Sequence, residues 1–171
     1  HPTHLNNTYL LYKKNWTGIN IDLSEFSIDL FNFARPKDMN INCAVSENEG
    51  EIIYYHQKKF SQLTTTIKEE ALKRMQGFIK EKKILSQKLT TVLDKSKFNK
   101  RKIDFLNIDV EGADFGVLKS LDFKTYRPRI ICVEIIDKVI DKSEIYKFLK
   151  DLDYTKKWSS KFNHIFIDNL L

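Results

Sequence analysis

The stretch "IDFLNIDVEGADFGVLKSL", residues 103–121, places a buried strand, a sharp turn and a helix next to one another. Five of its first eight residues are apolar, and we expect them to form a buried strand. Asp109 and Glu111 stand at the end of this strand, and Gly112 permits the turn after it. The apolar spacing beyond the turn predicts a helix that runs to about Leu121.

Strands and helices alternate along the rest of the chain. Further strands are expected at 18–23, 40–46, 50–57 and 127–136, and helices at 25–35, 64–81, 91–95 and 143–152. The last two strands, 154–161 and 163–170, read as an antiparallel pair. We therefore expect one α/β domain over residues 1–171. It should have a mostly parallel, Rossmann-like sheet, helices on both faces and a C-terminal antiparallel hairpin.

Composition narrows the class of protein. A chain of 171 residues that is 42% hydrophobic can bury the core of one domain. No run approaches the roughly 18 apolar residues of a membrane span, and the start lacks the pattern of a secretion signal. We expect a soluble, cytoplasmic protein with no membrane partner. Cys43 and Cys132 lie in apolar runs and are expected to be buried thiols.

The net charge is +6, from 29 Lys and Arg against 23 Asp and Glu. The excess is concentrated at 95–102 and 156–161. A basic surface can attract nucleic acid, but exposed lysines commonly serve solubility alone, and no other feature supports that partner. The sequence thus does not favour a nucleic-acid partner.

Four carboxylates fall at or near the ends of three expected parallel strands: Asp22, Asp109, Glu111 and Glu134. Residues two apart in a strand point to the same side, so Asp109 and Glu111 should project together. Open parallel sheets bind ligands beyond these carboxyl ends. Such a rim suits a ligand with hydroxyls to hold and positive charge to stabilise. S-adenosylmethionine, with its ribose hydroxyls and its cationic sulfonium and ammonium groups, is a ligand of this kind.

The same segments resemble the FkbM-type methyltransferases, a family of S-adenosylmethionine-dependent enzymes. "IDFLNIDVEGADFGVLKSL" together with "YRPRIICVEI" is similar to the family's strand, D-x-E-G turn, helix and next strand. "GINIDL", "NCAVSENEGEIIYY" and "KLTTVLDK" resemble further family segments in the same order. The resemblance covers roughly residues 8–135. It implies methyl transfer from S-adenosylmethionine, with a sugar or another small hydroxyl compound as acceptor.

One family segment has no counterpart here. The family begins with a strand and a D-x-G-A turn that carries the methionine part of the cofactor, whereas this chain opens with "HPTHLNNTYLLYKKNW", which resembles the family's loop and helix start beyond that turn. In the family's sheet the missing strand lies between those that correspond to 18–23 and 103–110. Its loss would leave a gap with unpaired backbone on both sides. Another segment could fill this gap, but we expect an N-terminally truncated sheet.

The resemblance assigns roles to individual residues. Asp22 would hold the ribose hydroxyls, and the segment Ala44, Val45 and Ser46 would border the adenine. Asp109 and Glu111 would frame the methionine end of the cofactor and the acceptor hydroxyl, and one of them would accept the acceptor's proton.

Each role has a structural alternative. Asp22 could be an acid at a helix start ahead of the N-cap Ser24, and residues 44–46 could be an ordinary strand end. Asp109 and Glu111 could cap the helix after Gly112.

The N-terminal segment adds two candidates. Asn7 lies in the loop that would come after the cofactor turn, where it could contact the cofactor or, like Thr8, cap the next helix. His4 is a candidate catalytic base. The four histidines never fall at H-x-x-x-H spacing, so no metal site is expected.

Two other classes of function remain open. Asp109, Glu111 and Glu134 could ligate magnesium in a phosphoester enzyme, because all three offer hard oxygen ligands. The chain could also be a non-catalytic binding protein with a methyltransferase fold. The lysine-rich region 58–83 is a candidate for the acceptor pocket, but neither the acceptor nor the oligomeric state can be inferred from the sequence.

Overall fold

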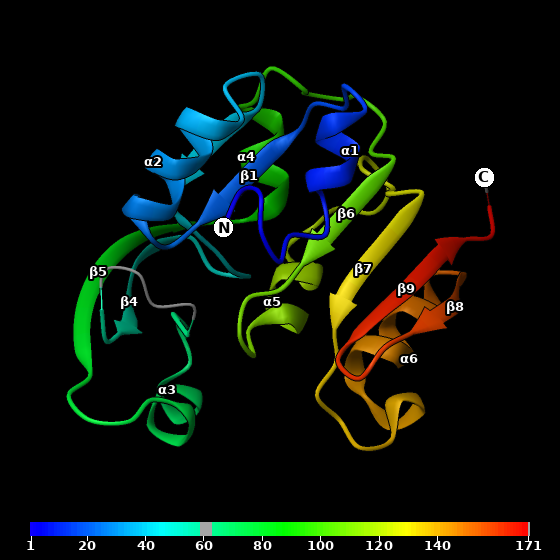
Figure 1. Cartoon of the computed structure of the whole chain (residues 1–171). Helices are drawn as coiled ribbons and strands as arrows, with labels where there is room; N and C mark the ends of the chain where they lie inside the picture. Colours follow the sequence, from blue (N-terminus) through cyan, green and yellow to red (C-terminus); the bar gives the residue numbers. More distant parts are fainter. Residues whose placement is uncertain (59–62, 171) are drawn as a thin grey trace.

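The computed structural model describes residues 1–58 and 63–170. Its strands are β1 (Ile19–Asp22), β2 (Met39–Asn42), β3 (Ala44–Val45), β4 (Gly50–His56), β5 (Lys80–Gln87), β6 (Phe105–Ile108), β7 (Ile130–Glu134), β8 (Tyr154–Ser159) and β9 (Asn163–Asp168). Its helices are α1 (Tyr9–Lys13), α2 (Glu25–Ala34), α3 (Lys68–Arg74), α4 (Leu89–Asp94), α5 (Asp114–Lys119), the 3-10 turn η1 (Ile140–Lys142) and α6 (Glu144–Asp151). Figure 1 shows their arrangement.

The strands form three hydrogen-bonded groups. β1 pairs with β2 in parallel, and β6 pairs with β7 in parallel. β7 continues into the antiparallel ladder β7-β9-β8, and β5 lies between a parallel partner, β3, and an antiparallel one, β4. The C-terminal hairpin is therefore confirmed. The sheets are small and mixed, and they do not show the single, mostly parallel sheet expected from the sequence.

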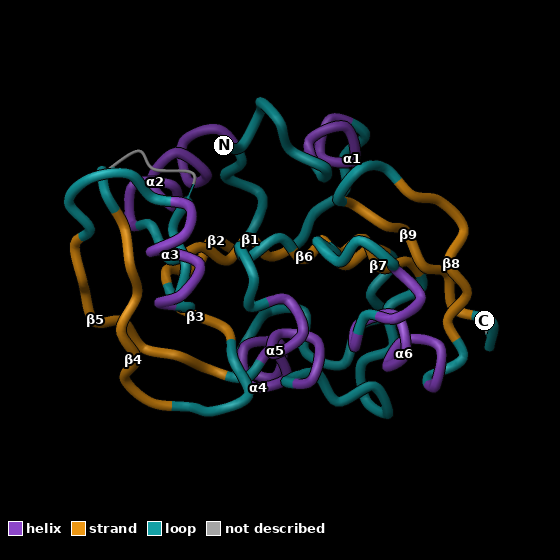
Figure 2. The backbone as a smooth tube through the Cα atoms, turned by 90° about the horizontal axis from the view of Figure 1, so that it is seen from below, coloured by secondary structure: helices purple, strands orange, loops and turns teal. Residues whose placement is uncertain are grey.

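Helices cover two sides of these strands. Viewed along the sheet in Figure 2, β2, β1, β6, β7 and β9 succeed one another across the molecule. α1 and α2 lie on one side of this row, and α4, α5 and α6 lie on the other. No helix in residues 1–58 and 63–170 is long and apolar enough to cross a membrane.

The main core lies beneath α5 and α6. Leu118 of α5 and Leu149 of α6 are fully buried against Ile131 and Val133 of β7. β7 is paired on both edges and contributes an unbroken apolar run, as its sequence predicted. Cys43 and Cys132 are buried free thiols, which confirms that expectation.

Two expected elements differ from the structure. The helix expected over 64–81 ends at Arg74, and Gly77 takes a left-handed φ of +87°. From Lys80 onward the chain forms β5, which pairs with the whole of β4. The backbone hydrogen bonds of that ladder outweigh the helical spacing of the apolar residues. The strand expected at 40–46 is divided into β2 and β3 at Cys43.

Candidate active site

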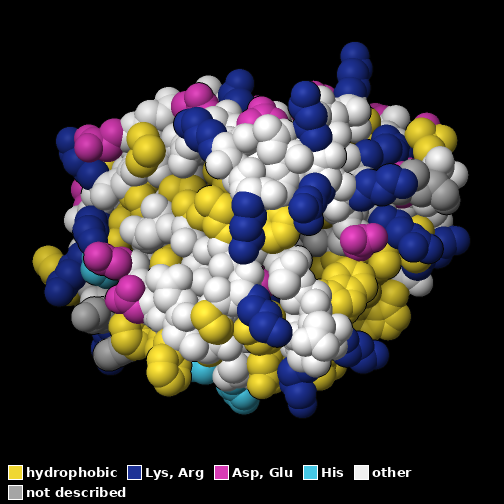
Figure 3. Space-filling view, turned by 90° about the horizontal axis from the view of Figure 1, so that it is seen from above, with side chains coloured by type: hydrophobic (Ala, Val, Ile, Leu, Met, Phe, Trp, Pro, Cys, Tyr) yellow, Lys and Arg dark blue, Asp and Glu magenta, His cyan; other side chains and the backbone are white. Residues whose placement is uncertain are grey.

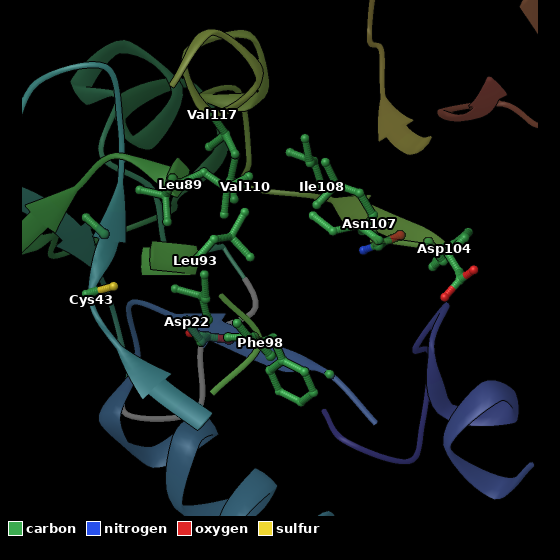
Figure 4. Close-up of a pocket in the computed structure, with 18 of the residues that line it drawn as sticks. Asp22, Cys43, Leu89, Leu93, Phe98, Asp104, Asn107, Ile108, Val110 and Val117 are labelled. Carbon is green, nitrogen blue, oxygen red and sulfur yellow. The ribbon is translucent and has the colours of Figure 1, made fainter. Parts of the chain in front are cut away.

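A cavity of about 280 Å³ separates β1 from β6. Within the described part of the chain these two strands do not pair, and each leaves one backbone edge facing the gap. Apolar side chains from several elements form the walls, including Leu89, Leu93 and Val110, which Figure 4 shows pointing into the space between the strands. The gap expected from the sequence is thus present, and it is a cavity rather than a collapsed core.

The arrows of β1 and β6 point the same way in Figure 1. Their amino ends lie at the face shown in Figure 3, where Lys and Arg side chains gather around exposed apolar ones. Arg101 and Lys102 line the cavity toward this basic end. Asp22 ends β1, and Asp109 comes directly after β6. The carboxylates that the sequence singled out therefore lie at the opposite, carboxyl end.

Asp22 lies in the cavity wall, and its Oδ1 accepts a hydrogen bond of 2.7 Å from the Ser24 amide. This contact fits the helix-start alternative, and Ser24 caps α2 as expected by accepting from the Ser27 amide. The role of Asp22 toward the ribose hydroxyls stays a prediction, and its place in the cavity wall is compatible with both interpretations. Burial raises the pKa of Asp22, and the bond from Ser24 opposes this rise.

Of the three residues expected to border the adenine, two line the cavity and one does not. Ala44 and Val45 line the cavity beside Asp22. Ser46 does not, because its hydroxyl bonds to Ser86 Oγ and to the Asn48 carbonyl, each at 2.8 Å. The structure thus brings two of these three residues to the cavity wall.

The turn after β6 separates Asp109 from Glu111. Asp109 is exposed and makes no hydrogen bond to any described residue, whereas the carboxylate of Glu111 forms an ion pair with Arg74 of α3. Neither residue caps the next helix, so that alternative is wrong. Asp114 holds the turn instead, since its carboxylate accepts the amides of Val110 at 3.2 Å and Gly112 at 3.1 Å.

The acidic groups around this turn raise one another's pKa. Asp114 is 3% exposed, and burial raises its pKa to about 6. Burial, helped by the negative charges of Asp109, Asp114 and Glu111, raises the pKa of Glu134 to about 7. Glu134 lies opposite Asn163 across β7 and β9, and one buried oxygen of each side chain lacks a hydrogen-bond partner among the described residues. Glu134 is therefore the group of this rim that titrates closest to neutral pH.

The N-terminal candidates lie outside the cavity wall. Asn7 donates to Asn107 Oδ1 at 2.8 Å, which anchors the N-terminal segment on β6. It does not cap α1, and neither does the Thr8 side chain; Asn6 instead accepts from the Thr8 amide at 3.0 Å. Of the two expected caps, Thr8 does occupy the N-cap position of α1, but its side chain makes no capping hydrogen bond. His4 is exposed and makes no hydrogen bond to a described residue, so its role as a base stays a prediction.

Within residues 1–58 and 63–170, no three His, Cys, Asp or Glu side chains converge in a way that could hold a metal ion. Glu111, one of the ligands considered for magnesium, is engaged by Arg74. The donor set of a phosphoester enzyme is therefore not assembled here.

Sequence reasoning missed Arg74 and Asp114. Arg74 is 37 residues from its partner Glu111 along the chain, and no local pattern relates the two. Asp114 could have been found, because an acid two residues after a turn glycine is well placed to accept the amides of that turn.

The fold is α/β, and Asp22 and Asp109 lie at the carboxyl ends of the two strands that border the cavity. The family model of the methyltransferase FkbM domain matches residues 2–156. This span is most of the chain, and the chain belongs to the FkbM methyltransferase family, which confirms the resemblance seen in the sequence. No curated protein and no solved structure matches the chain.

Proposed function

We propose that this methyltransferase uses S-adenosylmethionine and methylates a hydroxyl of a sugar or another small acceptor. The observation that carries the proposal is the placement of Asp22 and Asp109 at the carboxyl ends of β1 and β6, the two strands that border the gap where the family's first strand would lie. Membership of the family supports it.

The cavity residues fit the cofactor. Asp22 offers a carboxylate, the group that accepts from ribose hydroxyls, and Ala44 and Val45 supply an apolar border for a purine. The acidic rim formed by Asp109 and Glu134 suits a ligand that carries positive charge.

S-adenosylmethionine supplies, when bound, an electrophilic methyl group on a sulfonium. The protein's contribution is to align the acceptor hydroxyl and to remove its proton. Asp109 is the better placed of the two predicted bases, because it is exposed and makes no hydrogen bond to a described residue, while Arg74 engages Glu111.

The proposal also includes a single Rossmann-like sheet. In the row of Figure 2, β2-β1 and β6-β7-β9-β8 face each other across the cavity. We regard them as two halves of one Rossmann-like sheet. Two features support this interpretation: β1 and β6 point the same way, and helices flank the row on both sides.

The remaining expectations stay proposals. We place the acceptor pocket in or near the region 58–83, of which residues 59–62 lie outside the described residues. A cytoplasmic location and a small-molecule or glycan acceptor are also proposed.

Calorimetric titration with S-adenosylhomocysteine tests the cofactor. We expect saturable binding to the wild type and at least about tenfold weaker binding to Asp22→Asn, since a charged hydrogen bond contributes about 1.5–3 kcal/mol and tenfold corresponds to about 1.4 kcal/mol. Asp29→Asn makes the same chemical change on the exposed face of α2 and should bind like the wild type. Equal binding by all three proteins would remove Asp22 from the site.

The same titration separates the other classes of function. Tight magnesium binding with no response to S-adenosylhomocysteine would favour a phosphoester enzyme. Absence of binding to either ligand would favour a non-catalytic protein.

A further inference from the structure

Arg74, at the end of α3, reaches the turn after β6. Its guanidinium Nη1 bonds to Glu111 Oε2, and the two side chains are 33% and 20% exposed. Desolvation strengthens such a pair relative to one in open water. Arg74 is thus the cation that α3 brings to the acidic rim.

Two further contacts attach the α3 segment to the same turn. The Thr65 hydroxyl donates to the Glu111 carbonyl at 2.9 Å. The Glu70 side chain packs on Gly112 so closely that a Cβ there would lie 3.0 Å from Glu70 Cγ. Main chain and side chain of Glu111 are therefore both held from the α3 side.

Glu111 needs this support because its φ is +56°, in the left-handed region. This conformation is unfavourable for a residue with a side chain, and it persists only where the surroundings impose it. The contacts from Thr65 and Arg74 impose this conformation on Glu111. They thereby also fix the position of Asp109, two residues earlier.

The charge of Arg74 also acts on its neighbours. Neighbouring protein groups displace part of the hydration of Asp109, Glu111 and Glu134 and so raise their pKa values, and in each case the charge of Arg74 opposes the rise. Five acids surround this turn: Asp109 and Glu111 within it, Asp114 from α5, Glu134 from β7, and Glu70 from α3, which also pairs with Lys73 at 3.5 Å. The negative charge of Asp109 adds to burial in raising the pKa of the Cys132 thiol. Loss of Arg74 would leave these acids to repel one another.

We propose that Arg74 is a positioning residue of the active site, which holds Glu111 in the turn and leaves Asp109 as the free carboxylate that meets the ligand. This inference rests on the proposed function. It divides the two acids by role: Glu111 anchors the turn to α3, and Asp109 contacts cofactor or acceptor.

Calorimetry with S-adenosylhomocysteine from pH 4 to pH 9, over the range in which the protein stays folded, tests this division. Asp109→Asn should weaken binding by about tenfold or more, whereas Glu111→Gln should weaken it less, because Arg74 still faces Asp109. Arg74→Gln should shift the pH dependence of affinity to higher pH, and Arg74→Lys, which keeps the charge, should restore it. Arg129→Gln, which removes an exposed arginine before β7, is the matched control and should behave like the wild type.

Two results would overturn the proposal. One is an unchanged pH dependence in Arg74→Gln, measured on protein whose thermal unfolding shows that it is folded. The other is a loss of binding in Glu111→Gln as large as in Asp109→Asn.

A second measurement does not depend on the cofactor. The ¹³C resonance of the Asp109 carboxyl, assigned with Asp109→Asn, reports its titration in the free protein. We expect the midpoint to lie higher in Arg74→Gln than in the wild type, and an unmoved midpoint would contradict the role of the charge. If the wild type fails to bind S-adenosylhomocysteine, the proposed function fails, while this titration still decides whether Arg74 acts on Asp109.

Discussion

At the scale of single residues, the carboxylates of the site differ in what surrounds them. Arg74 engages Glu111, two backbone amides bind Asp114, and Asp109 stays exposed. Glu134 has a buried oxygen without a partner among the described residues. Their types and positions were visible in the sequence. Their partners were not, because these contacts join segments that are distant along the chain.

Glu134 should make the stability of the protein depend on pH. Its pKa is about 7 in the folded protein, against an ordinary value of 4.5, so the folded state binds more protons between these values. The stabilisation is complete below about pH 4.5 and is lost as the pH rises through 7. Asp114, with a pKa of about 6, acts in the same direction. The free energy of unfolding should fall from pH 5 to pH 8.

Urea unfolding at several pH values measures this dependence. Glu134→Gln should reduce the fall by roughly 1–2 kcal/mol, a value lowered from the full pKa shift because solvent screens a partly exposed group. Glu81→Gln, an exposed acid of β5, should leave the slope unchanged. Identical slopes in Glu134→Gln and the wild type would refute the raised pKa.

At the scale of elements, α2 holds β1 and β2 in place on one side of the cavity. Its N-terminus is satisfied by the Ser24 side chain, which accepts from the Ser27 amide at 3.3 Å. Ser24→Ala should therefore cost about 1 kcal/mol of stability, as is usual for an N-cap. Ser24→Asp, which keeps an acceptor, should retain most of it. Chemical unfolding distinguishes these outcomes, and equal stability of Ser24→Ala and the wild type would exclude the cap.

The sequence predicts a helix or strand correctly where it marks the end of the element and where its apolar residues have the matching spacing. α2 has its Ser24 cap, β7 its continuous apolar run, and the C-terminal hairpin its alternation. The region 64–81 could not, because its helical spacing extended into residues that instead pair with β4. Whether such a segment forms a helix or a strand depends on the strand with which it can pair. A short stretch of sequence does not show that partner.

At the scale of the whole molecule, the strands that border the cavity should be less protected from hydrogen exchange than the other strands. β7 is paired on both edges, whereas β1 and β6 each have one edge unpaired within the described residues. In a parallel strand, alternate amides point to opposite edges. Roughly half of the amides of β6 should therefore exchange with solvent much faster than those of β7.

Hydrogen exchange measured by mass spectrometry or NMR tests this contrast. Peptides over 105–108 should take up deuterium earlier than peptides over 130–134. Equal protection of the two strands would mean that the cavity is closed in solution.

The two cysteines bear on the conditions under which the fold persists. Burial raises the pKa of both thiols, that of Cys132 to about 11, so very little of either is thiolate near neutral pH. Thiolate is the form that oxidants and disulfides attack. Neither side chain is thus primed to respond to redox conditions, and the fold should tolerate oxidising and reducing surroundings alike.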